Sequence, residues 1–211
     1  IVPGRGKDQD PWRAFKKAWA RTEPPHFQEM NDRKHRGDTF FDQWSSADRS
    51  LRPRLVSDIE GARADGRTQL VYVVSGGQHA DVGWLLKTLT DLLQAEQAVW
   101  RIGLIVINED VASLREARFV IREHRLRHLW KGPRLEACFL GMNFYNVSHV
   151  LRMKKLLQEH QVVLQGVMHN LGIYAYEAHM HAREYERYFS VFRSVMPANG
   201  WLEVEDVSLR R

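Results

Sequence analysis

Apolar runs of strand length alternate with stretches of helical periodicity over most of the chain. The first run, residues 70–74, is β-branched and aromatic, and a Ser-Gly-Gly sequence follows it. This pattern predicts a buried strand that ends in a tight turn. After Asp81 and Gly83, leucines recur at helical spacing over residues 84–93. A strand, a glycine turn and a helix form one half of a βαβ unit.

The same alternation continues toward the end of the sequence. Apolar runs at 102–107, 135–142, 162–168 and 201–207 predict four more strands, and residues 111–126, 148–160 and 181–195 have the apolar spacing of helices. Strands that alternate with helices favour parallel pairing through right-handed crossovers. We therefore predict a Rossmann-like α/β domain over residues 68–211, with a mostly parallel sheet and helices on both faces.

Residues 1–67 precede this alternation and form a predicted N-terminal extension, partly helical and partly irregular. Trp12, Phe15 and Trp19 share one helical face after Pro11, and residues 46–62 carry apolar side chains about four positions apart. The frequent aromatic residues favour packing of this segment against the main domain over docking on a partner.

The composition and the net charge of the chain limit which partners and which cellular compartments we expect. The formal net charge of +5 permits an anionic partner such as RNA but does not require one. Cys138 is the only cysteine, and its apolar surroundings predict a buried thiol without a disulfide or a cysteine-ligated zinc ion. No apolar run approaches the ~20 residues of a membrane span, and the first residues do not resemble a signal peptide. We expect an intracellular protein, cytoplasmic or organellar.

Several residues with binding chemistry follow the predicted strands. In open α/β sheets, ligands bind beyond the carboxyl ends of the strands. The residues at these positions are Ser75, Gly76 and Gly77, then Glu109 and Asp110, then Asn143, and then His169 and Asn170. Backbone N–H groups in a glycine turn and carboxylates after the second strand suit an adenosine-type ligand. A plain strand-to-helix turn and capping of the next helix are the alternatives.

The end of the chain carries a family resemblance. The sequence YERYFSVFRSVMPANGWLEVEDV resembles the helix, Pro-x-x-Gly turn and fifth strand of class I S-adenosylmethionine-dependent methyltransferases, and VVLQGVMHNLG resembles their fourth strand. The resemblance implies a Rossmann-like fold that binds S-adenosylmethionine. It implies contacts of Ser75, Gly76 and Gly77 with the methionine part, of Glu109 or Asp110 with the ribose, of Asn143 with the adenine, and of His169 and Asn170 with the methyl group.

Histidines and tyrosines gather after the fourth predicted strand. Histidine side chains can act as general bases near neutral pH, and we assign that role to His169 there; a purely structural histidine is the alternative. We expect the methyl acceptor to lie near His169 and Tyr174. Glu177, His179 and His181 would share a face only in an extended segment. A packed aromatic loop is the simpler interpretation, so we predict no metal site.

Two predicted helices carry more basic than acidic side chains. The basic residues that we assign to RNA binding are Arg115, Arg118, Arg122 and Arg125 on one helix and Lys154 and Lys155 on the next. If these helices are neighbours, the two runs form one positive face for phosphates. A solvated helix exterior is the alternative.

The leading hypothesis is a methyltransferase that acts on an undetermined acceptor, either a small molecule or a macromolecule. The segment from Ser75 to Gly83 is longer and poorer in glycine than the Gly-x-Gly-x-Gly loop of the family. The alternative function is therefore a catalytically inactive relative with a structural or RNA-binding role in a ribonucleoprotein or a larger protein assembly.

Overall fold

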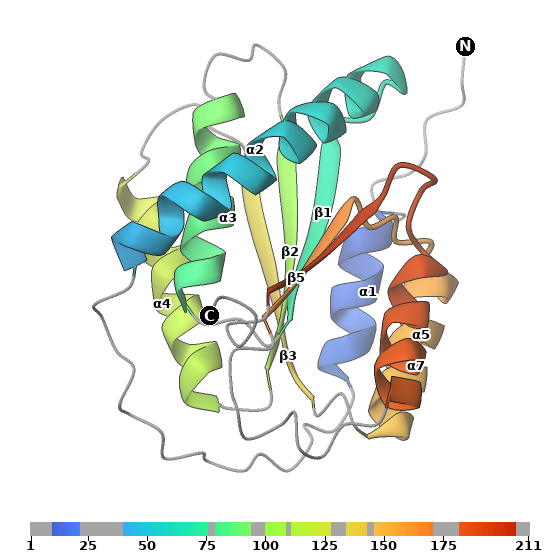
Figure 1. Cartoon of the computed structure of the whole chain (residues 1–211). Coiled ribbons are helices and arrows are strands. Elements are labelled where there is room, and N and C mark those ends of the chain that lie inside the picture. The colour runs from blue at the N-terminus through green and yellow to red at the C-terminus, as the bar shows by residue number, and fades with distance from the viewer. Residues whose placement is uncertain are drawn as a thin grey trace.

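The computed structural model describes residues 10–21, 40–75, 79–93, 100–108, 111–127, 134–142, 146–170 and 182–205. Helices and strands alternate along them after two initial helices (Figure 1). The helices are α1 (Pro11–Ala20), α2 (Phe40–Ala64), α3 (His79–Leu93), α4 (Val111–Arg127), α5 (Val147–Glu159) and α7 (Ala182–Arg193). The strands are β1 (Gln69–Ser75), β2 (Arg101–Asn108), β3 (Arg134–Gly141), β4 (Gly166–Asn170) and β5 (Trp201–Glu205).

The strands form one five-stranded sheet in the order β3-β2-β1-β4-β5. Every neighbouring pair is parallel, which confirms the predicted Rossmann-like α/β architecture. The chain moves outward from β1 to β2 and β3, and then returns to the other side of β1 for β4 and β5. The point where this direction reverses lies between β1 and β4, and it is where doubly wound sheets bind their ligands.

Helices cover both faces of the sheet. Figure 1 shows α2, α3 and α4 on one side of the strands and α1, α5 and α7 on the other. Successive strand residues point to opposite faces, so Tyr72 packs with the first group of helices and Val73 with the second. Each face has its own hydrophobic core, and the strands are buried because both faces are covered.

Helix α1 is anchored to the sheet by its aromatic face. The Asp10 side chain accepts a hydrogen bond from the backbone N–H of Trp12 and caps the helix. Trp12 and Phe15 are fully buried, with ring centroids 5.9 Å apart. A Cβ atom at Gly103 in β2 would lie 3.3 Å from Trp12 Cε2, so the indole packs directly on the backbone of β2. The predicted packing of these aromatic side chains against the main domain is confirmed.

Helix α2 is held at the centre of the sheet by a buried polar junction. The Asp58 carboxylate accepts hydrogen bonds from the Tyr72 hydroxyl (3.0 Å) and from the Trp201 indole N–H (2.9 Å). Asp58 is only 1% exposed, and burial raises its pKa despite these two hydrogen bonds. The junction ties α2 to β1 and β5, on both sides of the reversal point.

The structure corrects the predicted start of one helix. The spacing of the leucines suggested that a loop continues through Gly83, whereas α3 begins at His79 and includes Asp81 and Gly83. A glycine inside a helix costs ~1 kcal/mol relative to alanine. Burial of Val82 and Trp84 in the core outweighs this cost. The connection between β1 and α3 is therefore three residues long.

Cys138 is the buried thiol that the sequence predicts. It lies on β3, and burial raises its pKa to about 12, as expected for an inert thiol.

Among the described residues, no helix is both long and apolar enough to span a membrane.

Candidate functional site

Parallel pairing brings the carboxyl ends of the strands to one rim. Ser75 at the end of β1 is in register with Ile107 of β2 and with His169 of β4. Asn108 at the end of β2 is in register with Gly141 at the end of β3. The strand ends from which the predicted ligand-binding residues continue are therefore neighbours, as the sequence analysis required.

The predicted cofactor and catalytic residues fall into two groups. Ser75 is buried as the last residue of β1, and the backbones of His169 and Asn170 end β4. The predicted residues that lie outside the described part of the chain are Gly76, Gly77, Glu109, Asp110, Asn143 and Tyr174. Their roles at the rim stay predictions.

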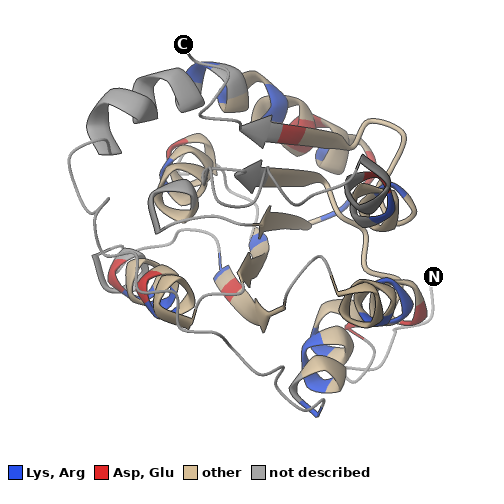
Figure 2. Cartoon of the chain, turned by 60° about the horizontal axis from the view of Figure 1, so that its bottom comes forward, with Lys and Arg blue, Asp and Glu red and all other residues tan. Residues whose placement is uncertain are grey.

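The two basic helices lie on opposite faces of the sheet. Helix α4 packs beside α3, and α5 packs beside α1 and α7 (Figure 1). The crossover through α5 moves across the sheet in the opposite direction to the one through α4, so right-handed connections place the two helices on different faces. The condition for a shared positive face, that these helices are neighbours, is not met. Lys and Arg positions, blue on the ribbon in Figure 2, occur on helices of both layers.

The side chains on these helices have contacts of their own. The Arg118 guanidinium lies 4.9 Å from the ring centroid of Phe139 in β3. Lys155 forms an ion pair with Glu159 on α5, with the two charged atoms 3.6 Å apart. Lys154 is partly buried, and Arg115 and Arg122 are exposed, as the alternative of a solvated helix exterior expects. RNA binding by these residues and by Arg125 stays a prediction.

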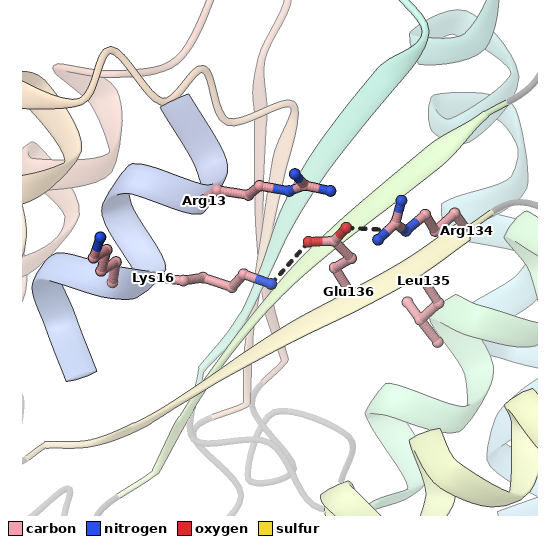
Figure 3. A pocket seen from close by; sticks show the side chains of 6 residues that line it. Arg13, Lys16, Arg134, Leu135 and Glu136 are labelled. Atoms are coloured by element: carbon pink, nitrogen blue, oxygen red, sulfur yellow. Dashed lines mark hydrogen bonds and ion pairs between the residues drawn. The ribbon is translucent and has the colours of Figure 1, made fainter. Parts of the chain in front are cut away.

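A basic pocket lies between α1 and the start of β3, and we call it the α1–β3 pocket. It has a volume of about 820 Å³. Its lining residues are Arg13, Lys16, Lys17, Arg134, Leu135 and Glu136. Figure 3 shows the side chains of Arg13 and Lys16 extending from α1 toward β3. Four of the six lining residues are cationic and one is anionic, so the pocket carries an excess of positive charge.

Glu136 is the centre of this pocket. Lys16 Nζ donates a hydrogen bond of 2.8 Å to Oε2, and Arg134 Nε lies 3.1 Å from Oε1 (Figure 3). Burial alone would raise the pKa of the carboxyl group, but the hydrogen bond from Lys16 and the charges of Lys16, Arg134 and Arg101 lower it overall. Glu136 is thus a buried, ionised carboxylate that fixes the positions of two cations.

Asp10 has a similar role at the beginning of α1. It forms ion pairs with Arg101 at the start of β2 and with Arg13, whose Nε lies 3.7 Å from Oδ2. A negative charge at this end also stabilises the helix through its dipole. The carboxylates of Asp10 and Glu136 therefore join α1 to the first residues of two strands.

The pattern of the sequence alone does not reveal this pocket. One signal was present, because Arg13, Lys16 and Lys17 recur at helical spacing on the side of α1 away from its aromatic face. A second signal was Glu136, an acid next to the apolar run that forms the third strand. Neither signal shows that positions 16 and 136 meet, because 120 residues separate them.

Comparisons with known proteins do not extend the assignment beyond the fold. The sequence matches no protein-family model, and no curated protein matches it with significant similarity. Within the described ranges, no group of three or more His, Cys, Asp or Glu side chains is arranged to hold a metal ion. His179 and His181, the histidines weighed as metal ligands, lie outside those ranges.

Proposed function

We propose that the chain is an S-adenosylmethionine-dependent methyltransferase that acts on a small or macromolecular acceptor. The observation that carries the proposal is the all-parallel strand order β3-β2-β1-β4-β5. It places the end of β1 beside the ends of β2 and β4 at the reversal point of the sheet, where nucleoside-type cofactors bind in such folds. The resemblance of the last two strands to class I methyltransferases supports the same cofactor.

In this proposal the residues of the chain mainly hold the cofactor and the acceptor in place, and few of them take part in the chemistry. Gly76 and Gly77 would contact the methionine part of the cofactor, Glu109 or Asp110 would hold the ribose hydroxyls, and Asn143 would contact the adenine. When bound, the cofactor would supply an activated methyl group to an acceptor aligned with its sulfonium. Because the methyl donor is already activated, alignment supplies most of the rate enhancement.

His169 is the proposed general base. It would remove a proton from the acceptor during methyl transfer, and Asn170, the next residue, would contact the methyl group. Tyr174 would contribute to the acceptor side of the site. A neutral imidazole near physiological pH suits this proton transfer.

Calorimetric titration with S-adenosylhomocysteine tests the cofactor site without turnover. We expect micromolar binding by the full chain. A variant with Glu109→Ala and Asp110→Ala should bind about 10-fold more weakly or worse, because losing the ribose contact costs about 1.4 kcal/mol or more. A control with Asp91→Ala and Glu159→Ala removes two exposed carboxylates from α3 and α5 and should leave the affinity unchanged.

A second function fits the charge of the chain. It is a catalytically inactive methyltransferase-like subunit with a structural role, or one that binds RNA, in a ribonucleoprotein or larger assembly. The net charge of +5 and the exposed basic side chains on α4 and α5 favour it. Absence of heat with millimolar S-adenosylhomocysteine, together with RNA binding that weakens with salt, would reject the first function and support this one. Either function places the protein inside the cell, in the cytoplasm or an organelle, where cofactor and RNA are available.

A further inference from the structure

We propose that the α1–β3 pocket is a docking site for the sugar–phosphate backbone of a nucleic acid. None of the residues that line this pocket is among those that the sequence assigned to RNA binding. It is built from α1 and the start of β3, and the inference holds whether or not the rim of the sheet carries a methyltransferase.

Two arginines in the pocket are oriented for phosphate. Arg13 Nε lies 3.7 Å from a carboxylate oxygen of Asp10, and Arg134 Nε lies 3.1 Å from one of Glu136, and these contacts direct the two guanidinium groups. Their side chains are 48% and 59% exposed. Figure 3 shows both groups extending toward the space between α1 and β3. A guanidinium group held in this way can donate two parallel hydrogen bonds to one phosphate.

The cations on α1 are arranged along a line. Arg13 and Lys17 are four residues apart on one helix, which corresponds to about 6 Å along its axis. Two cations at this separation on one helix can contact neighbouring phosphates of one strand. Lys17 has no ion pair within the described ranges and is exposed. A row of cations at this spacing suits a repeating polyanion.

The shape of the pocket favours a chain over a small ligand. It is an open groove on the surface and not an enclosed cavity. Small-molecule sites bury most of the surface of their ligand, which an open groove does not achieve. A nucleic acid strand can pass along such a groove and continue beyond it.

The buried carboxylate strengthens the site and does not repel the ligand. Both oxygens of Glu136 already contact a cation, Lys16 or Arg134, and its side chain is only 9% exposed. An incoming phosphate therefore meets a lining with four cations and one carboxylate, an excess of three positive charges. Trp12 and Phe15 fix α1 on the sheet from the other side, so little ordering of the helix is required when the ligand binds.

The pocket lies at the opposite end of the sheet from the candidate cofactor rim. Arg134 is the first residue of β3, whereas the rim begins after Gly141. A strand of 8 residues extends over about 25 Å. No small acceptor can contact both places at once, and a nucleic acid can.

Fluorescence anisotropy with the full chain and a labelled single-stranded RNA of about 20 nucleotides tests the proposal, at salt concentrations from about 50 to 200 mM. The variant R13A/K17A removes two exposed cations outside the Glu136 ion pairs. Loss of two phosphate contacts should make the slope of log K against log salt shallower by about 1.4 and weaken binding about 25-fold at ~0.1 M salt. The matched control R63A/K87A removes two exposed cations from α2 and α3, on the other face, and should bind as the wild type does.

Five outcomes would overturn the inference. Four of them are no RNA binding by the wild type, an unchanged slope and affinity in R13A/K17A, an equal loss in R63A/K87A, and displacement of the RNA by micromolar inorganic pyrophosphate, which would indicate a small-anion site. Polyglutamate of matched charge should compete poorly, and stronger binding of polyglutamate than of RNA would assign the pocket to an acidic protein instead. A thermal unfolding curve of each variant should show that the chain is folded at the temperature of the assay.

Discussion

A single added methyl group tests the junction that joins the two halves of the sheet. Gly166 begins β4 and is in register with Tyr72 of β1 and Trp201 of β5. A Cβ atom at position 166 would lie 2.2 Å from Cε2 and from Cζ2 of the Trp201 indole, far inside van der Waals contact. In Gly166→Ala the indole must therefore move, and its hydrogen bond to Asp58 is lost with it.

The two consequences set the size of the effect. Overpacking a well-packed core costs about 1–3 kcal/mol, and leaving a buried polar group without its partner costs about 1–3 kcal/mol. We expect Gly166→Ala to lower the free energy of unfolding by about 4 kcal/mol. For a chain of this length, a loss of that size lowers the melting temperature by about 8–16 °C.

Urea and thermal unfolding measure this loss directly. Gly61→Ala is the matched control, because a Cβ atom there meets only Asn199 at an ordinary 3.4 Å and alanine favours the helix. In a Trp201→Ala background the colliding atoms are absent, so the additional cost of Gly166→Ala should fall below about 1 kcal/mol. An equal cost in both backgrounds, or a loss below about 1 kcal/mol in the wild type, would refute the reasoning.

Three predictions concern two buried titratable groups, Asp58 and Cys138. Because burial raises the pKa of Asp58, its contribution to stability is fully present below the ordinary value of 3.8 and declines as pH rises through the raised pKa; urea titrations should show this decline in the wild type and not in Asp58→Asn. Asp58→Ala should cost about 1–3 kcal/mol for each donor, Tyr72 and Trp201, that loses its acceptor, and a variant as stable as the wild type would contradict this. Cys138, with a pKa of about 12, should react with iodoacetamide at pH 8 only after unfolding, and rapid labelling of the native chain would contradict the burial.

The strands were predictable because their signal is local. Residues 70–74 and 102–107 are apolar throughout, as strands covered on both faces must be, and the structure places them in β1 and β2. The start of β4 was predicted four residues too early. Val162 and Leu164 are buried like strand residues, yet ladder pairing begins only at Gly166, where β1 and β5 both become available as partners. Pairing depends on distant segments, and periodicity contains no information about them.

The candidate site was predictable only in part for the same reason. Parallel strand order implied a common rim, and the registers of Ser75 and His169 agree with it. The hypothesis of a joint basic face on the fourth and fifth helices required knowledge of which helix covers which face. The face that each helix covers follows from the reversal of the strand order after β3. The order of the strands in the sheet cannot be read from the sequence alone.

Helix α1 lies outside the alternating strands and helices, and it contributes three of the four cations of the α1–β3 pocket. The fold of the alternating part does not imply these cations. Without α1, Glu136 on the edge strand β3 would lose its hydrogen bond from Lys16 and keep only the ion pair with Arg134. The same helix needs Gly103 in β2 as the surface for Trp12. Residues of the core are thus fitted to α1, and α1 brings Arg13 and Lys17 to the end of the sheet opposite the rim. Since a fold does not determine function, these fitted residues are stronger evidence for a second binding surface than the net charge of the chain.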